Sequence, residues 1–315
     1  MATIQFRPVS LADCEAVRQQ VYATDCRNSD LNFMNLMSWR FFFETELAFH
    51  NGWLLFRFKA AGHSAYLPPV GVGDCRDILL ELMADADAQG EPFRLMGVCE
   101  HALNHLQEMF PGNFDYTSDR SYTDYVYRRE TLAQLSGKKL QPKRNHIHRF
   151  EHLYPDYQYR DLIPEMFAEC LDLVGKWNRK KEDIAGRLSV EDERQALQFT
   201  FDNWNELCGR GGVILVDNRI VAFTYGAPIN HDTFDVCVEK ADVDYEGAFT
   251  VINREFARHL PERFIYINRE EDLGIEGLRK AKLSYQPEWL LDKYIVTKKQ
   301  VDCVQSISST DKIKP

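Results

Sequence analysis

The first hydrophobic positions of the chain predict a short strand followed by a helix. The strand IQFRP ends near Arg7, and Ser10 is of a residue type that favours the helix N-cap. Apolar residues then recur at the spacing of one helix face: Leu11, Cys14, Val17 and Val21. A second segment, from Tyr157, repeats this order, with a strand to Arg160 and Pro164 at the start of a helix. The pattern therefore predicts two units with the same opening, about 150 residues apart.

A predicted hairpin follows each opening. GWLLFRFKAAGHSAYLPPV is expected to turn at Ala61 and Gly62, and GGVILVDNRIVAFTYGAPI at Asp217 and Asn218. Each half then continues with a helix, a buried strand, a helix and a final strand. The buried strands are FRLMGV from Phe93 and FIYIN from Phe264, and the final strands are YTDYVY from Tyr122 and LLDKYIV from Leu290. Two α/β units of like order suggest a duplication.

Length and composition fit two globular domains. The chain has 315 residues, of which 44% are hydrophobic and 27% charged, and two domains of about 150 residues are the usual solution at this length. We expect an α/β (α+β) fold with a mixed sheet flanked by helices in each domain. The domains are expected to span residues 1–145 and 146–303, and the polar residues 304–315 are expected to form a disordered tail.

Several classes of protein are disfavoured. No apolar stretch reaches the 18 or so residues needed to span a membrane, and Arg7 and Asp13 interrupt the start where a signal peptide would need an apolar run, so we expect a cytoplasmic protein. Eight cysteines without a CxxC pair favour reduced thiols over disulfides or zinc, and we expect no metal site. His101 and His105 are spaced i, i+4 but have no third ligand nearby. The net charge of −10 means that any anion site must be local.

One strongly basic run, GKKLQPKRNHIHRF, lies between the halves. Its candidate anion-binding residues are Lys138, Lys139, Lys143, Arg144 and Asn145. Side chains this dense in positive charge need water or an anion, and phosphate is the obvious candidate. As the link between the halves, the run is expected to lie at the cleft between them and to bind phosphate there. The alternative is a solvated basic helix face that binds nothing.

An acidic run follows the predicted strand FIYIN. That strand would deliver Asn268, Arg269, Glu270, Glu271 and Asp272 to its carboxyl end, where ligands bind in open α/β sheets. Repulsion among the carboxylates would raise the pKa of at least one toward the range of a general base. The helix that follows carries further basic residues, of which Arg279 and Lys282 are candidate anion ligands. The alternative is an acidic helix N-terminus with an amphipathic surface helix, which needs no ligand.

A third candidate lies in the strand TFDVCVEKAD. Strict alternation would place Phe234, Val236 and Val238 on one face, and Asp235, Cys237 and Glu239 on the other. Glu239 would then end the strand beside the cleft as a base or an amine-binding carboxylate. A structural ion pair between Glu239 and an arginine is the alternative.

These strings resemble a known family. The segments LSGKK…KRN, VEKAD and NREEDLG…LRKAK…Y-P are similar to the bacterial family related to the phosphatidylglycerol lysyltransferase C-terminal (catalytic) domain, whose members have tandem GNAT-like acyltransferase domains. The resemblance covers nearly the whole chain. It implies transfer of an aminoacyl group from aminoacyl-tRNA to a lipid headgroup, in a cleft between the two halves.

The resemblance also bears on the donor. Where a coenzyme A-dependent GNAT enzyme would carry a Q/RxxGxG/A cradle for pyrophosphate, this chain reads VDYEGAFTVIN, with one glycine and acidic residues. We therefore expect an aminoacyl-type donor, with acyl-CoA as the alternative co-substrate, no permanently bound cofactor, and tRNA as a partner. The acceptor would be an amine or hydroxyl of a small molecule or lipid headgroup, and one carboxylate among Glu239, Glu270, Glu271 and Asp272 would be the base. The rival hypothesis is a non-catalytic protein that binds an anionic metabolite in the same cleft.

Overall fold

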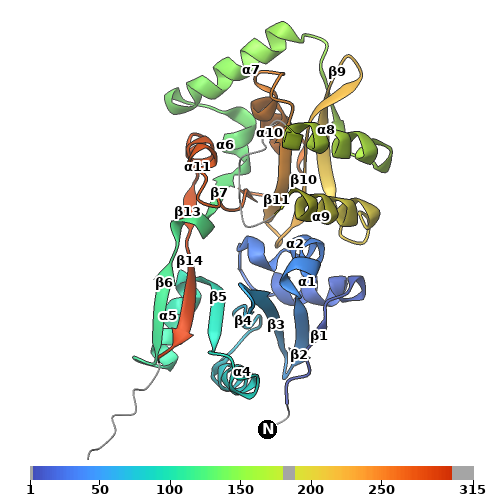
Figure 1. Ribbon diagram of the computed structural model, residues 1–315. Coiled ribbons are helices and arrows are strands. Elements are labelled where there is room, and N and C mark those ends of the chain that lie inside the picture. Colours follow the sequence, from blue (N-terminus) through green and yellow to red (C-terminus); the bar gives the residue numbers. More distant parts are fainter. Residues whose placement is uncertain (1–2, 180–188, 300–315) are drawn as a thin grey trace, which may run out of the picture.

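The computed structural model describes residues 3–179 and 189–299, which fold into two seven-stranded mixed sheets flanked by helices (Figure 1). The expected disordered tail, residues 304–315, lies outside the described residues, as does Cys303. The expected α/β class is confirmed by this arrangement.

Sheet A has the strand order β1-β2-β3-β4-β5-β14-β6. Its strands are β1 (Arg7–Pro8), β2 (Glu46–His50), β3 (Trp53–Ala60), β4 (His63–Tyr66), β5 (Arg94–Cys99), β6 (Phe114–Ser118) and β14 (Lys293–Lys298). Neighbouring strands are antiparallel except β4 and β5, which are parallel.

Sheet B read from its other edge has the order β8-β9-β10-β11-β12-β7-β13. Its strands are β7 (Asp124–Arg128), β8 (Gln158–Asp161), β9 (Arg210–Val216), β10 (Arg219–Pro228), β11 (Thr233–Ala241), β12 (Tyr266–Asn268) and β13 (Trp289–Leu291). Here β11 and β12 form the parallel pair, so the two sheets have the same order and the same directions.

The two sheets exchange one strand. The sixth strand of sheet A is β14, from the end of the chain, and the sixth strand of sheet B is β7, from the first half. The expected boundary between residues 145 and 146 lies inside a helix, α7 (Gln141–Leu153). A cut at that boundary would not separate the two sheets, because each half supplies one strand to the other.

Helices cover both faces of each sheet (Figure 1). Sheet A is flanked by α1 (Cys14–Tyr22), α2 (Phe33–Ser38) and α3 (Arg40–Phe43) on one side, and by α4 (Arg76–Ala88) and α5 (Glu100–Met109) on the other. Sheet B is flanked by α8 (Phe167–Arg179) and α9 (Val190–Asp202) on one side, and by α6 (Arg129–Gln134), α7 and α10 (Ala248–His259) on the other. Helix α11 (Glu276–Leu283) follows β12. Short 3-10 turns are η1 (Leu11–Asp13), η2 (Ser29–Leu31), η3 (Arg120–Tyr122), η4 (Lys138–Leu140) and η5 (Pro164–Met166).

One hydrophobic core is shared between the halves. It includes Val17 and Met34 from the first half, and Leu197 and Phe223 from the second. A hydrogen bond of 2.7 Å between the hydroxyls of Ser38 and Thr200 also joins α2 to α9. The halves are therefore held together by packing as well as by the strand exchange.

The local predictions agree with the structure where turns and caps decide the conformation. Ser10 and Asp13 form a capping box, and both predicted hairpin turns have positive φ at their two central positions: Ala61, Gly62, Asp217 and Asn218.

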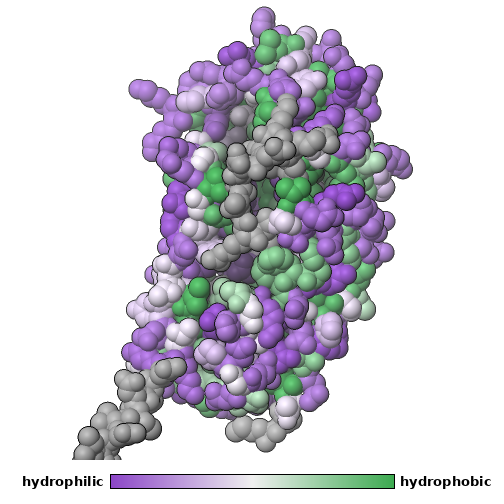
Figure 2. All heavy atoms as spheres, viewed as in Figure 1, coloured by the Kyte–Doolittle hydropathy of each residue, from purple (hydrophilic) through white to green (hydrophobic). Residues whose placement is uncertain are grey.

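The surface visible in Figure 2 is mostly hydrophilic, with scattered hydrophobic patches. Among the described residues, no helix combines the length and apolar character needed to cross a membrane.

Candidate functional site

The candidate site lies where β12 parts from β11. The two parallel strands pair at only three positions, the last of which is Asp235 with Asn268. Beyond this point β12 ends and the chain turns away, with Glu270 in the left-handed region at φ 54°. Strand β11 continues to Ala241, so the acidic run that follows β12 lies beside an edge that β12 no longer covers.

A β-bulge in β11 decides which side chains face this site. Tyr225 pairs with Val238 and Gly226 with Val236, so Cys237 is the extra residue. Gly226 permits the close approach, because a Cβ there would lie 1.7 Å from the carbonyl oxygen of Asp235.

The bulge overturns the expected alternation. Val238 packs with Cys237 against the core shared by the halves, whereas Glu239 reaches the opposite face of sheet B and accepts a hydrogen bond of 3.1 Å from Asn253 of α10. The expectation that Glu239 shares a face with Asp235 and Cys237 is wrong, because the extra residue shifts the period by one.

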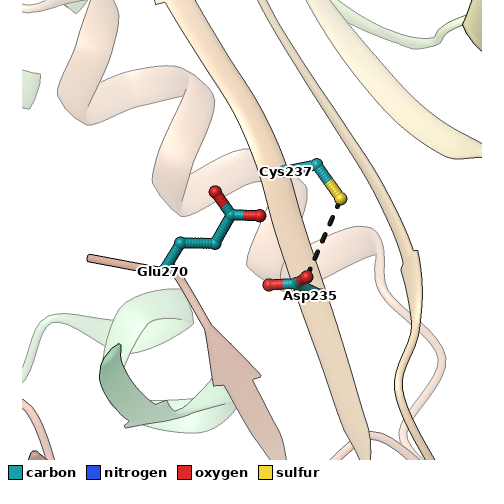
Figure 3. A group of neighbouring side chains, drawn as sticks. All are labelled: Asp235, Cys237 and Glu270. Carbon is teal, nitrogen blue, oxygen red and sulfur yellow. Dashed lines mark hydrogen bonds between the residues drawn. The ribbon is translucent and has the colours of Figure 1, made fainter. Parts of the chain in front are cut away.

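Three side chains converge at the parting of the strands: Asp235, Cys237 and Glu270, which we call the acid–thiol cluster (Figure 3). Their ligand-type atoms all lie within 4.8 Å of one another, and Cys237 Sγ is 3.8 Å from Asp235 Oδ2. Figure 3 shows the other Asp235 oxygen directed away from Cys237, on the side where Glu270 lies. This oxygen, Oδ1, is buried and has no hydrogen-bond partner among the described residues.

Two amides from the first half complete the site. Asn32 and Asn35, at the start of α2, donate hydrogen bonds of 2.9 and 3.2 Å to Asp235 Oδ2. Asn35 also donates a bond of 2.7 Å to Glu270 Oε1. Because both halves contribute, the site exists only where the halves meet.

Burial and mutual repulsion favour the protonated forms of the three groups in the cluster. Burial, followed by the charge of Glu271, raises the pKa of Glu270 to about 8. Burial and the charge of Glu270 raise the pKa of Asp235 well above its usual range, and burial together with Asp235 raises that of the Cys237 thiol. The cluster can therefore accept or release a proton near neutral pH. Two carboxylates and one thiol are also a possible set of ligands for a cation such as Zn²⁺.

The next carboxylate, Glu271, belongs to a buried ion-pair group. Its Oε2 lies 3.5 Å from the ammonium of Lys293 on β14, which also contacts Asp30 at 3.0 Å and Asp124 of β7 at 2.9 Å. Burial raises the pKa of Glu271 even though Lys293 opposes that shift. Lys282 fixes the backbone of the acidic run that follows β12, because its ammonium donates to the carbonyls of residues 269, 270 and 271.

Asp272 has the opposite environment from Glu270. Arg279 contacts both of its oxygens at 2.8 and 2.9 Å, and the Tyr125 hydroxyl donates a bond of 2.6 Å. Burial alone would raise its pKa, but the bonds from Arg279 and Tyr125 outweigh burial and lower the pKa of Asp272 to about 2. Asp272 is thus an ionised anchor for α11, and a poor base.

Glu239 forms the structural ion pair that the sequence offered as its alternative role. Arg269 Nη2 lies 2.8 Å from Glu239 Oε1, and both side chains are almost fully buried on the α10 face. The Lys143 ammonium lies 3.9 Å from the centre of the Tyr285 ring, over which Arg269 also lies. Burial, followed by the charge of Arg269, lowers the pKa of Lys143 to about 8.

The rest of the basic run is apart from the acid–thiol cluster. Helix α7 packs against α10, at the end of the second half that is remote from the first half (Figure 1). Lys138 and Lys139 are exposed, whereas Arg144 donates to the carbonyls of residues 135 and 137 and so closes its own loop. Asn145 accepts a bond of 2.8 Å from Gln141. The expected position of this run at the cleft between the halves is wrong, because the helix that carries it covers α10 instead.

Sequence reasoning missed half of this site. Asn268, a predicted ligand, instead donates to Asp124 Oδ2 at 2.8 Å and positions β7. The site residues not selected from sequence are Asn32, Asn35, Asp124, Asp235, Cys237 and Lys293. The available signal was Asp235 itself, a charged residue between Phe234 and Val236 in a strand that is otherwise apolar.

Comparison with known proteins identifies a family whose model matches this chain and solved structures that share its fold. The family described as phosphatidylglycerol lysyltransferase, C-terminal, matches residues 23–297. A conserved protein of unknown function from Bacteroides thetaiotaomicron is 47% identical, with a TM-score of 0.91 over 94% of this chain and 100% of that one. An uncharacterised protein of Mycoplasmoides gallisepticum is 24% identical over 181 residues, and the match spans 56% of this chain and 56% of that relative's length.

Two more distant structures bear on the fold alone. L-PGS from Bacillus licheniformis has a TM-score of 0.67 at 14% identity, over 96% of this chain and 95% of that one. A tandem GNAT protein from the clavulanic acid biosynthesis pathway has a TM-score of 0.50 at 10% identity, over 95% of this chain and 100% of that one. The GNAT-like fold expected from the sequence is confirmed.

Proposed function

Because the chain belongs to the family of phosphatidylglycerol lysyltransferase C-terminal domains, we propose that it transfers an aminoacyl group to an amine or hydroxyl acceptor, with Glu270 as the general base. One observation carries this proposal. Glu270 has a pKa of about 8 and lies where the two halves meet, beside the edge of β11 that β12 leaves uncovered. A base is most effective when its pKa is close to the working pH.

The environment of each carboxylate favours Glu270 over the other candidates. Glu239 is neutralised by Arg269, and Asp272 is held ionised by Arg279. Glu271 lies 3.5 Å from Lys293, whereas Glu270 accepts a hydrogen bond from a neutral amide, that of Asn35. Of these four candidate carboxylates we therefore assign Glu270, with its pKa raised to about 8, as the base.

The reaction proceeds by acyl transfer. The acceptor nitrogen or oxygen attacks the carbonyl carbon of the aminoacyl ester while Glu270 removes its proton. The bond between that carbon and the ester oxygen then breaks, and the proton passes to the leaving oxygen. In this scheme, backbone N–H groups on the edge of β11 beyond Asp235 would stabilise the oxyanion.

The way the N-terminal end of α10 is covered supports an aminoacyl-type donor over acyl-CoA. A pyrophosphate would need the N–H groups that begin this helix. Gly247, at the N-cap of α10, lies so close to α7 that a Cβ there would be 2.7 Å from the carbonyl oxygen of His146. Arg149 of α7 also lies 2.9 Å from Glu246 in the preceding loop. This helix end is already covered, which leaves little room for a pyrophosphate.

The test is a transfer assay with two kinds of donor. Purified protein is incubated with a set of labelled aminoacyl-tRNAs and, in parallel, with acyl-CoA thioesters, each with amines, hydroxyl compounds and lipid vesicles as acceptors. We expect loss of the aminoacyl ester above spontaneous hydrolysis, with a labelled product. Turnover of acyl-CoA alone would contradict the donor. Tight binding of a ligand without turnover of any donor would favour the rival, a non-catalytic binding protein.

A further inference from the structure

Two cysteines from different halves meet at the surface, away from the acid–thiol cluster. Cys14 is the first residue of α1, and Cys208 lies in the turn between α9 and β9. The Cys14 thiol donates to the carbonyl oxygen of Glu206 at 3.3 Å, and its side chain is also hydrogen-bonded to Cys208. The two thiols are therefore neighbours across the junction of the halves.

A guanidinium prepares one of these thiols for reaction. Arg18, one helical turn after Cys14, donates from Nη1 to Cys208 Sγ at 2.9 Å. The hydrogen bond from Cys14, followed by the charge of Arg18, outweighs burial and lowers the pKa of Cys208 to about 6. The same hydrogen bond and burial raise the pKa of Cys14. Cys208 is thus the thiolate of the pair and Cys14 the thiol.

The pair is also open to small molecules. Cys208 is exposed, and Arg18 lines an open pocket of ≈ 380 Å³ together with Tyr22 and His231. A small oxidant can therefore reach Cys208 from solvent without unfolding of either half.

We propose that Cys208 and Cys14 are a peroxide-sensitive thiol pair that closes into a disulfide between the two halves. The Cys208 thiolate attacks one oxygen of hydrogen peroxide, hydroxide leaves, and the sulfur is oxidised to a sulfenic acid. The Cys14 sulfur then attacks the Cys208 sulfur, and the sulfenic hydroxyl leaves as water with the proton of the Cys14 thiol. The hydroxide of the first step takes up the proton that the Cys208 thiol had released and becomes the other water. Two thiols and one peroxide thus give one disulfide and two waters.

A second pair serves as an internal comparison. Cys26 and Cys99 are also hydrogen-bonded to each other, and this bond lowers the pKa of Cys99 to about 6. Both belong to the first half, and both are partly buried. Exposure and the Arg18 contact favour the Cys14 and Cys208 pair as the faster one to react.

The experiment is disulfide mapping after exposure of the full chain to one equivalent of hydrogen peroxide. We expect a peptide cross-link between Cys14 and Cys208, and a mass decrease of two hydrogen atoms. The decrease should be absent in Cys14→Ser and Cys208→Ser but retained in Cys26→Ser. Arg18→Gln should slow the reaction of Cys208 with an alkylating reagent by about tenfold or more at pH 7, because the Cys208 thiolate loses the positive charge beside it. The oxidised protein should melt at a higher temperature, since the cross-link closes a long loop.

Two results would overturn the proposal. The first is a cross-link between Cys26 and Cys99 that forms while Cys14 and Cys208 still react with an alkylating reagent. The second is oxidation of Cys208 to sulfinic acid without any cross-link, which would mean that Cys14 cannot reach it. Cys170, a buried cysteine, gives the control for general loss of structure, because it should stay unmodified throughout.

Discussion

The ammonium of Lys293 lies 2.9 Å from Oδ1 of Asp124, and these are the first residues of the two exchanged strands. Asp124 opens β7 and Lys293 opens β14, which hold the same place in the order of their sheets. Asp124 Oδ2 accepts further bonds from the backbone and hydroxyl of Ser29 and from Asn268. The point where the strands cross between the halves is thus a buried, charge-paired junction.

Loss of the cation at this junction should destabilise the whole protein. Lys293→Met would leave Asp124 buried without a cation, and breaking a buried pair typically costs about 3–5 kcal/mol. Lys298→Met, at the exposed end of the same strand, is the control and should change stability by about 1 kcal/mol or less. Urea denaturation measures both. If the two variants lowered the free energy of unfolding equally, the buried junction would stabilise the protein no more than an exposed lysine does.

Neutralisation of Glu270 should separate catalysis from folding. Glu270→Gln should lower kcat by about 10²–10⁴ while the donor affinity stays within about tenfold, because a general base acts in the transition state. Glu276→Gln, an exposed acid on α11, is the matched control and should keep full activity. A single-turnover assay with titration of donor binding gives both quantities. If Glu270→Gln loses activity only in proportion to folded protein, Glu270 is not the base.

The rate should depend on pH in a defined direction. Glu270 must be ionised to act as a base, so kcat/KM should rise with pH and level off above about 8. A pH profile of the wild type checks this, and a flat profile between pH 6 and 9 would contradict the assignment.

Stability should change with pH in the opposite direction. The pKa of Glu270 is raised from 4.5 to about 8 by folding, so the unfolded chain binds fewer protons than the folded chain between these values. The free energy of unfolding should therefore fall as pH rises through this window, by up to about 1.4 kcal/mol per pH unit for one proton. Glu270→Gln should reduce this slope. Urea denaturation at several pH values measures the slope, and an unchanged slope would mean that Glu270 titrates normally.

The exposed part of the basic run should contribute to tRNA affinity. Lys138→Glu combined with Lys139→Glu should weaken binding of aminoacyl-tRNA and flatten its salt dependence, since each lost phosphate contact removes about 0.7–0.9 from the slope. Lys298→Glu combined with Lys299→Glu reverses the same charge at the end of β14 and should have little effect. Filter binding at several salt concentrations compares them. Equal losses in both double variants would indicate only a general charge effect.

The local elements could be predicted from the sequence because their causes are local. The turn at Asp217 and Asn218 needs two residues that tolerate positive φ, and the cap at Ser10 needs only the neighbouring Asp13. Such signals act within a few residues, and the structure contains both features as expected.

The exchange and the site could not be predicted in the same way. YTDYVY and LLDKYIV have the apolar character of any buried strand, and nothing in either segment specifies which sheet it joins. The bulge at Cys237 depends on Gly226 in the neighbouring strand, and this one extra residue moved Glu239 to the other face of the sheet. Asn35 reaches Glu270 across 235 positions of the sequence. These relationships arise from pairing between distant segments, which a periodic pattern does not encode.

The strand exchange also constrains how the chain folds as it leaves the ribosome. Within the described part of the chain, strand β6 is joined to sheet A only through β14, so it emerges long before its partner exists. Synthesis of the intervening residues takes on the order of ten seconds. During that time β5 and β6 both have an open edge, while β7 has already emerged and must wait for sheet B. A cell that makes this protein has to keep these strands from pairing with other nascent chains until translation is nearly complete.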